Sequence, residues 1–182
     1  SPGCLTVVQL GRDQRPLPMR HRLLSGVLVV VTATQAFAQK SRSAERWLDD
    51  CRSGRYSGDR DREQWCDIRE QTIPVRSQLR VDGRENGGIE IIGSDRKDIL
   101  VISRIQTQAG SESDAKDIAG EIRIDVGDEI RAEGPSKRWR SSWSVSYEIQ
   151  VPRKINLDLT ATNGGISIEN VDGRLEFETT NG

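Results

Sequence analysis

Cys51 and Cys66 are the residues whose type and spacing most directly indicate covalent chemistry. In an exported protein two such thiols predict a disulfide, because thiols stay paired outside the reducing cytosol. Closing a loop of about 15 residues stabilises a fold by roughly 3 kcal/mol in the chain-entropy description. Zinc sites need closer cysteine pairs and further Cys or His ligands, and the single histidine, His21, lies in a predicted signal peptide. We therefore predict a structural disulfide, no metal and no cofactor.

The sequence offers little for nucleophilic catalysis. Without a histidine beyond the signal peptide, neither a Ser-His-Asp nor a Cys-His arrangement can be assembled. Paired carboxylates could still hydrolyse glycosides, and the candidates are Glu169, Asp172, Glu176 and Glu178. They occupy predicted turns and the polar sides of predicted strands, where solvated acidic residues are ordinary. We predict that the protein is not an enzyme; the alternative is a carbohydrate-active enzyme that uses paired carboxylates on a β-scaffold.

An aromatic stripe lies within residues 138–151. Its odd positions carry Trp139, Trp143, Tyr147 and aliphatic residues, with Ser141 as the one polar exception, while its even positions are polar. A strand sends alternate side chains to opposite faces, so the aromatic residues share one face. They could form a platform that stacks on sugars. Because the same face also carries Val145 and further aliphatic residues, we interpret the stripe as part of the core.

Glycine turns recur every nine residues near the end of the chain, at Asn163-Gly164, Asp172-Gly173 and Asn181-Gly182. We expect Gly164 and Gly173 to adopt positive φ, which glycine tolerates best. The full set of predicted turn residues is Gly83, Asn86, Gly87, Asn163, Gly164, Asp172, Gly173, Asn181 and Gly182. Alternation between the turns predicts inward-pointing Ile166, Ile168, Leu175 and Phe177, and exposed Glu169, Glu176 and Glu178.

A nine-residue step holds one short strand and one turn, which leaves no room for a helix in the repeat. The pattern therefore predicts an all-β fold of repeated short strands. We favour a β-solenoid or β-roll because Thr-Asn-Gly returns after 18 residues; the alternative is an antiparallel meander or sandwich. One short helix is predicted from Ser111 to Ala119, with Ser111 as its cap and Gly120 at its end.

Four segments are predicted along the chain. Residues 1–18 precede the first methionine and are interpreted as a non-native leader, and residues 19–38 have the charged, apolar and small-residue parts of a secretory signal peptide. Residues 39–73 are interpreted as a loop-rich, disulfide-containing segment with a short helix near its start. Residues 74–182 are interpreted as the repeated-strand domain, cut within a repeat at its C-terminal end. Cleavage after Ala38 would leave no stable transmembrane segment.

Charge excludes one class of partner. The whole chain carries a net charge of −1, and four arginines and one aspartate precede residue 39, so the predicted mature part is more acidic. A nucleic-acid-binding protein normally presents a basic field. We therefore predict no nucleic-acid partner.

Five motifs carry a family resemblance: Cys66-Asp67-Ile68-Arg69-Glu70, Asn86-Gly87-Gly88, the predicted helix, the strand from Trp143 to Pro152, and Thr162-Asn163-Gly164-Gly165. Over roughly residues 64–182 the chain resembles the bacterial family known as putative adhesins. The resemblance implies an exported protein of short repeated β-strands and supplies no functional residues. We expect an interaction or scaffold protein, periplasmic or on the cell surface, whose partner is an envelope or surface protein or a glycan.

Overall fold

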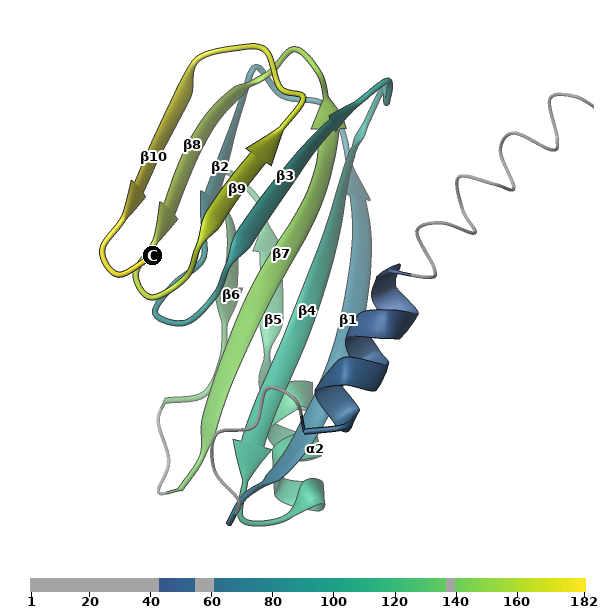
Figure 1. Cartoon of the computed structure of the whole chain (residues 1–182), viewed down its shortest axis with the longest axis vertical. Helices are drawn as coiled ribbons and strands as arrows, with labels where there is room; N and C mark the ends of the chain where they lie inside the picture. The colour runs from purple at the N-terminus through teal and green to yellow at the C-terminus, as the bar shows by residue number, and fades with distance from the viewer. Residues whose placement is uncertain (1–42, 55–60, 137–139) are drawn as a thin grey trace, which may run out of the picture. The chain divides into compact units, whose positions relative to one another are not determined.

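The structure is a computed structural model that describes residues 43–54, 61–136 and 140–182. These residues form two five-stranded sheets (Figure 1). Sheet 1 contains, in spatial order, β1 (Glu63–Ile73), β4 (Ile99–Ala109), β7 (Ser142–Pro152), β3 (Ile89–Ser94) and β9 (Ile166–Glu169). Sheet 2 contains β10 (Leu175–Thr179), β8 (Asn156–Ala161), β2 (Gln78–Asp82), β6 (Ile130–Glu133) and β5 (Arg123–Val126).

Three long strands make the antiparallel half of sheet 1. β4 pairs with β1 over its whole length and with β7 on its other side. The continuously apolar stretch Ile99–Ile102 is buried on both faces, as a central strand requires. β7 shows the predicted alternation, with Val145, Ile149 and the residues of the same parity turned toward the core.

The strands near the C-terminus pair in parallel instead. β8 lies between β2 and β10, and Leu157 is in register with Leu79 and with Leu175. β3 lies between β7 and β9, also in parallel. The turns at Asn163-Gly164 and Asp172-Gly173 therefore carry the chain from one sheet to the other, and they are not the hairpin turns of a meander.

The predicted β-rich class is confirmed, whereas the predicted solenoid or roll needs correction. Both sheets mix parallel with antiparallel pairs, since β1, β4 and β7 are antiparallel and so are β5 and β6. The domain is therefore not a uniform repeat roll. Two helices are described: α2 (Glu112–Glu121) within the β domain, and a helix over residues 43–52, near the start of the N-terminal segment where a short helix was predicted.

One hydrophobic core joins the two sheets. Its buried members come from strands of both sheets and include Leu79, Val81, Ile89, Ile91, Val101, Ile105, Ile130, Tyr147, Ile149, Leu157 and Leu159. α2 packs against β4 and β1; its Ala119 belongs to this core, while Ala115 and Ile118 form a second buried cluster with Ala109. In Figure 1, α2 lies at the end of the sheets away from β9 and β10. Ser111 caps α2 as predicted, while Gly120 lies inside the helix.

Gly164 and Gly173 lie at turns as expected, but the reason for glycine is different. Neither has positive φ; the one described glycine that has it is Gly54. A Cβ on Gly164 would lie 2.1 Å from the carbonyl oxygen of Gly87, and one on Gly173 would lie 2.1 Å from that of Ile155. Glycine is needed because one turn packs directly on the backbone of a neighbouring segment.

Cys51 and Cys66, the pair predicted to be bonded, are joined by a disulfide with Cα atoms 6.3 Å apart. The bridge ties the helix over residues 43–52 to β1. Residues 63–73, assigned from sequence to a loop-rich segment, form β1 instead. No helix within the described ranges is long and apolar enough to cross a membrane.

Several sequence predictions lie outside the described residues. They concern the leader over residues 1–18, the signal peptide over residues 19–38, the cleavage point after Ala38, and Trp139.

Candidate functional site

The carboxylates nominated for glycoside hydrolysis are solvent-exposed. Glu169, Glu176 and Glu178 are exposed strand residues, as predicted, and Asp172 is exposed beside β10. Glu176 forms an ion pair with Arg174. Within the described ranges, no group of three or more His, Cys, Asp or Glu residues is placed to hold a metal ion.

The aromatic stripe divides between the core and a pocket. Tyr147 is 1% exposed and belongs to the core, as predicted. Trp143 is half-buried and lines a pocket of about 420 Å³. The structure thus places Tyr147 in the core and Trp143 between the core and a pocket.

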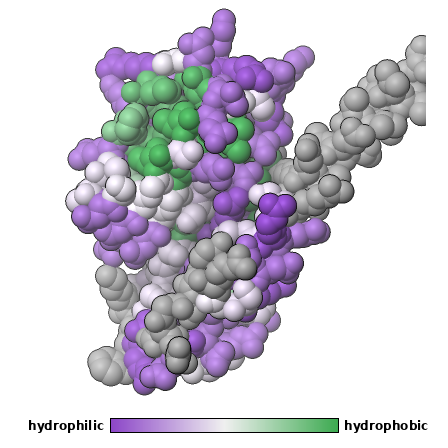
Figure 2. Space-filling view, viewed as in Figure 1, coloured by the Kyte–Doolittle hydropathy of each residue, from purple (hydrophilic) through white to green (hydrophobic). Residues whose placement is uncertain are grey.

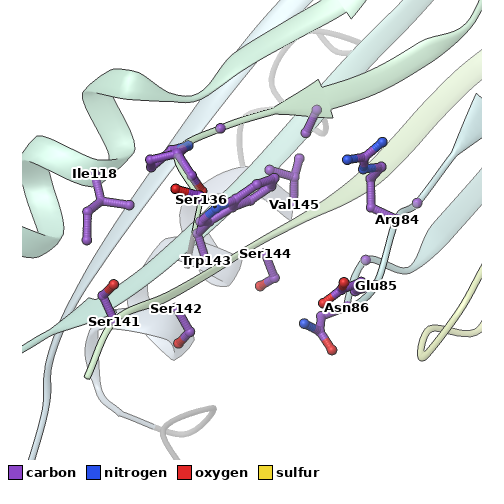
Figure 3. A pocket seen from close by; sticks show the side chains of 15 residues that line it. Arg84, Glu85, Asn86, Ile118, Ser136, Ser141, Ser142, Trp143, Ser144 and Val145 are labelled. Atoms are coloured by element: carbon purple, nitrogen blue, oxygen red, sulfur yellow. Dashed lines mark hydrogen bonds between the residues drawn. The ribbon is translucent and has the colours of Figure 1, made fainter. Parts of the chain in front are cut away.

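Four segments far apart in the sequence enclose this pocket. Its walls come from the β2–β3 turn (residues 83–87), the end of β6 with Ala132 and residues 134–136, the start of β7 (residues 141–145), and Ile118 of α2. Figure 3 shows Trp143 in the middle, with Arg84, Glu85 and Asn86 on one side and Ile118 and Ser141 on the other. An apolar floor thus faces a polar turn.

The Trp143 ring is held in a fixed orientation. Its Nε1–H donates a hydrogen bond to the carbonyl oxygen of Pro135 at 3.0 Å. Gly134 lies so close to the ring that a Cβ there would be 2.8 Å from ring carbons Cε2 and Cζ2. A side chain at residue 134 would displace the indole. The pocket therefore has a pre-organised aromatic wall, which limits the conformational entropy lost on binding.

The polar wall is the tight turn between β2 and β3. Arg84 has φ of 57°, in the left-handed region, and its backbone N–H donates to Asp82 Oδ1 at 2.8 Å. A Cβ on Gly87 would lie 2.1 Å from the carbonyl oxygen of Val145, so the turn rests directly on β7. This close contact places Arg84, Glu85 and Asn86 at the pocket. The sequence predicted the turn from its glycines but not its place beside Trp143.

The Tyr147 hydroxyl is kept neutral by its surroundings. Burial raises the pKa of Tyr147 well above its ordinary value, the charge of Asp82 raises it further, and Arg84 opposes the shift. The hydroxyl oxygen has no hydrogen-bond partner among the described residues. Tyr147 is thus a structural residue with a proton that it does not release near neutral pH.

A buried ion-pair cluster lies elsewhere on sheet 1. Glu148 of β7 is 6% exposed and accepts a hydrogen bond from Arg104 Nη2. Arg104 Nη1 is also 3.6 Å from Glu90 Oε2. Breaking a buried pair by removing one partner leaves an uncompensated charge. The cluster therefore has a structural explanation, in which it fixes the register of β3, β4 and β7.

Leu175 and Phe177 do not have the buried surroundings predicted for them. They share the parity of Leu157 and Leu159 on neighbouring β8, yet they are 39% and 63% exposed. Within the described structure no strand covers this face of β10. Figure 2 shows a hydrophobic patch at the end of the molecule where β9 and β10 lie. The strand was predicted correctly, but the inward position predicted for these two residues is wrong, because every residue of β10 is exposed.

No protein-family model matches the chain, and no curated protein does. The chain is similar to a crystal structure of a putative adhesin from Parabacteroides merdae, with TM-score 0.32 and 11% identity, over 62% of this chain and 43% of the other. It is also similar to a putative lipid binding protein from Parabacteroides distasonis, with TM-score 0.28 and 10% identity, over 60% of this chain and 46% of the other. The chain thus spans less than half of each of these structures.

Proposed function

We propose that the chain is a non-catalytic binding protein of the cell envelope, periplasmic or on the cell surface, and that it binds a glycan in the pocket beside Trp143. The observation that carries this proposal is the fixed indole ring opposite a polar turn. A volume of about 420 Å³ lies within the range of about 300–1,000 Å³ that is common for small-ligand sites.

The composition of the walls favours a sugar ligand. A pyranose ring has an apolar C–H face that packs on an aromatic ring, while its hydroxyl groups need hydrogen-bond partners. Trp143 supplies the aromatic surface. Asn86, Ser136 and Ser144 supply amide and hydroxyl groups around it. Because the ring of Trp143 is already fixed, little rotamer entropy is lost when a sugar binds.

The pocket residues favour binding over catalysis. Among the described residues that line it, Arg84 and Glu85 are the titratable side chains, and neither a histidine nor a lysine is among them to act as a base. Nucleophilic catalysis needs such a base within hydrogen-bond reach. This arrangement supports the sequence-based proposal of a non-enzymatic protein.

The disulfide supports export, because paired cysteines persist in oxidising compartments outside the cytosol. Secretion from a bacterial host followed by N-terminal sequencing tests it. A mature protein that starts at Gln39 supports cleavage after Ala38. An uncleaved, membrane-anchored product would contradict the proposal.

Calorimetric titration of the exported protein tests the glycan site. The probes are cellobiose, chitobiose, cellobiouronate and digalacturonate. We expect saturable binding of at least one probe, with affinity at least tenfold weaker in Trp143→Leu, which keeps an apolar side chain but removes the flat ring. Trp47→Leu, in the helix over residues 43–52, is the matched control and should bind as the unchanged protein does.

Two outcomes would overturn the proposal. One is the absence of saturable binding to every probe. The other is binding that Trp143→Leu leaves unchanged. Because a large core-facing substitution can unfold a domain, circular dichroism of each variant accompanies the titration. Gly134→Ala gives a second route, since it moves the Trp143 ring without removing it.

A further inference from the structure

Arg84 is an unexpected residue at its position in the β2–β3 turn. Its φ of 57° lies in the left-handed region, where glycine, asparagine and aspartate are the usual residues. A long side chain there destabilises the turn relative to those residues. Strained backbone of this kind concentrates at sites that bind or react. The strained conformation is therefore consistent with a binding role for the Arg84 side chain.

Among the described residues, the Arg84 guanidinium has an ion pair with Asp82 but no hydrogen-bond acceptor. The carboxylate oxygen Asp82 Oδ2 lies 3.9 Å from Nη1, beyond hydrogen-bond distance, and the Arg84 side chain is 50% exposed. Other arginines are engaged: Arg69 and Arg76 each donate to two backbone carbonyl oxygens. Among the described residues Arg84 has no such bonds. Its planar fork is available to a ligand.

The position of Arg84 in the pocket indicates which chemical group of a ligand it would bind. It lines the same pocket as Trp143, on the polar side (Figure 3). A guanidinium binds a carboxylate through two parallel hydrogen bonds, which is its most specific contact. A sugar ring stacked on the indole can present a carboxylate toward this side of the pocket.

We infer that the ligand is an acidic sugar, whose carboxylate is bound by Arg84 while its ring packs on Trp143. This inference rests on the proposed function and adds a ligand class to it. Asp82 reduces the local positive charge, so charge alone does not attract every anion. Recognition requires the two hydrogen bonds and the ring together.

Matched pairs of probes test the inference. Digalacturonate and cellobiouronate are each titrated beside their methyl esters, which keep the ring and remove the charge. In the unchanged protein we expect at least one acid to bind tenfold or more tightly than its ester. In Arg84→Gln the acid and its ester should bind about equally, because the acid loses more affinity than the ester does. Arg80→Gln, an exposed arginine on β2 outside the pocket, should keep the full preference.

A stability measurement separates binding from folding. Arg84→Asn suits the left-handed backbone, so its thermal midpoint should equal or exceed that of the unchanged protein, although it loses the preference for the acid. Equal binding of acid and ester by the unchanged protein would overturn the inference and leave the glycan site standing. A preference for the acid that survives Arg84→Gln would also overturn it. Failure of all four probes to bind would remove the proposed function as well.

Discussion

Asn181 Nδ2 donates a hydrogen bond to Oδ1 of Asn163, its counterpart 18 residues earlier, at 2.9 Å. Asn163 in turn donates to Asn86 Oδ1 at 3.4 Å. The three asparagines thus form a ladder in which Asn86 and Asn163 lie in turns between the two sheets and Asn181 follows β10. The return of Asn-Gly after 18 residues therefore has a physical basis, because each asparagine amide can donate to one neighbouring asparagine and accept from the next.

The ladder predicts an effect for Asn163, its middle member. Asn163→Ala removes two side-chain hydrogen bonds and should lower the free energy of unfolding by about 1 kcal/mol, because exposed bonds compete with water. Urea denaturation gives the value. Asn170 lies outside the ladder, but its φ of 56° disfavours alanine, so Asn170→Ala would destabilise the fold for another reason. Thr162→Ala, at a neighbouring exposed position, is the better comparison and should have the smaller effect if the ladder is stabilising.

Close packing of the turns predicts a large cost for added side chains. Gly164→Ala and Gly173→Ala each place a Cβ 2.1 Å from a backbone carbonyl oxygen, which cannot move as a flexible side chain can. We expect each to lower the free energy of unfolding by more than about 2 kcal/mol, as overpacking does. Gly165→Ala is the matched control, because nothing lies within 4 Å of its Cβ position. Equal tolerance at residues 164 and 165 would contradict the close approach.

The sequence predicted the strands that alternate cleanly and missed those whose pattern depends on partners. β7 was recognised because its two faces differ in polarity. β1 was missed because Asp67, Arg69 and Glu70 interrupt its apolar residues. Arg69 is accommodated there because its guanidinium donates to the carbonyl oxygens of Ala119 and Ile122 at the end of α2. No local pattern reveals a partner about 50 residues away.

The candidate site was predictable only in parts. The glycines located the β2–β3 turn, and the alternation located the Trp143 face. Their meeting depends on β3 pairing in parallel with β7, a long-range choice that neither segment encodes alone. The place of the Arg84 side chain at the pocket depends in addition on a left-handed backbone conformation, which arginine rarely adopts.

The different exposure of Leu159 and Phe177 predicts different losses of stability when each side chain is truncated. Leu159 on β8 is fully buried and Phe177 on β10 is 63% exposed. Leu159→Ala should cost about 2–5 kcal/mol, because it removes core contacts and leaves a cavity. Phe177→Ser should change the free energy of unfolding by no more than about 0.5 kcal/mol, and so should Glu178→Gln. Chemical denaturation of the three variants measures the contrast; a large loss in Phe177→Ser would show that β10 has a covering neighbour.

Reduction of the disulfide should destabilise the domain by roughly 3 kcal/mol, the amount expected for a loop of about 15 residues. Comparing unfolding with and without dithiothreitol measures this. Cys51→Ser with Cys66→Ser should behave like the reduced protein. A reduced protein as stable as the oxidised one would contradict a stabilising role for the bridge.

Tyr147 predicts a pH effect with a defined sign. Below about pH 10, the ordinary tyrosine pKa, both folded and unfolded chains keep the hydroxyl proton. Above that pH the unfolded chain releases it, while burial holds the pKa of Tyr147 higher in the folded chain. The unfolded state then binds fewer protons, so the free energy of unfolding falls by about 1.4 kcal/mol per pH unit until the folded state also ionises.

Tyr147→Phe removes this group and tests the effect directly. The variant should lose that part of the decline in stability above pH 10. Near neutral pH it should be as stable as the unchanged protein or more stable by about 1 kcal/mol, because it removes a buried hydroxyl that has no hydrogen-bond partner among the described residues. Urea denaturation from pH 7 to 11 measures both effects. Marked destabilisation at pH 7 would mean that the hydroxyl has a stabilising partner, and an unchanged decline above pH 10 would assign the titration to another group.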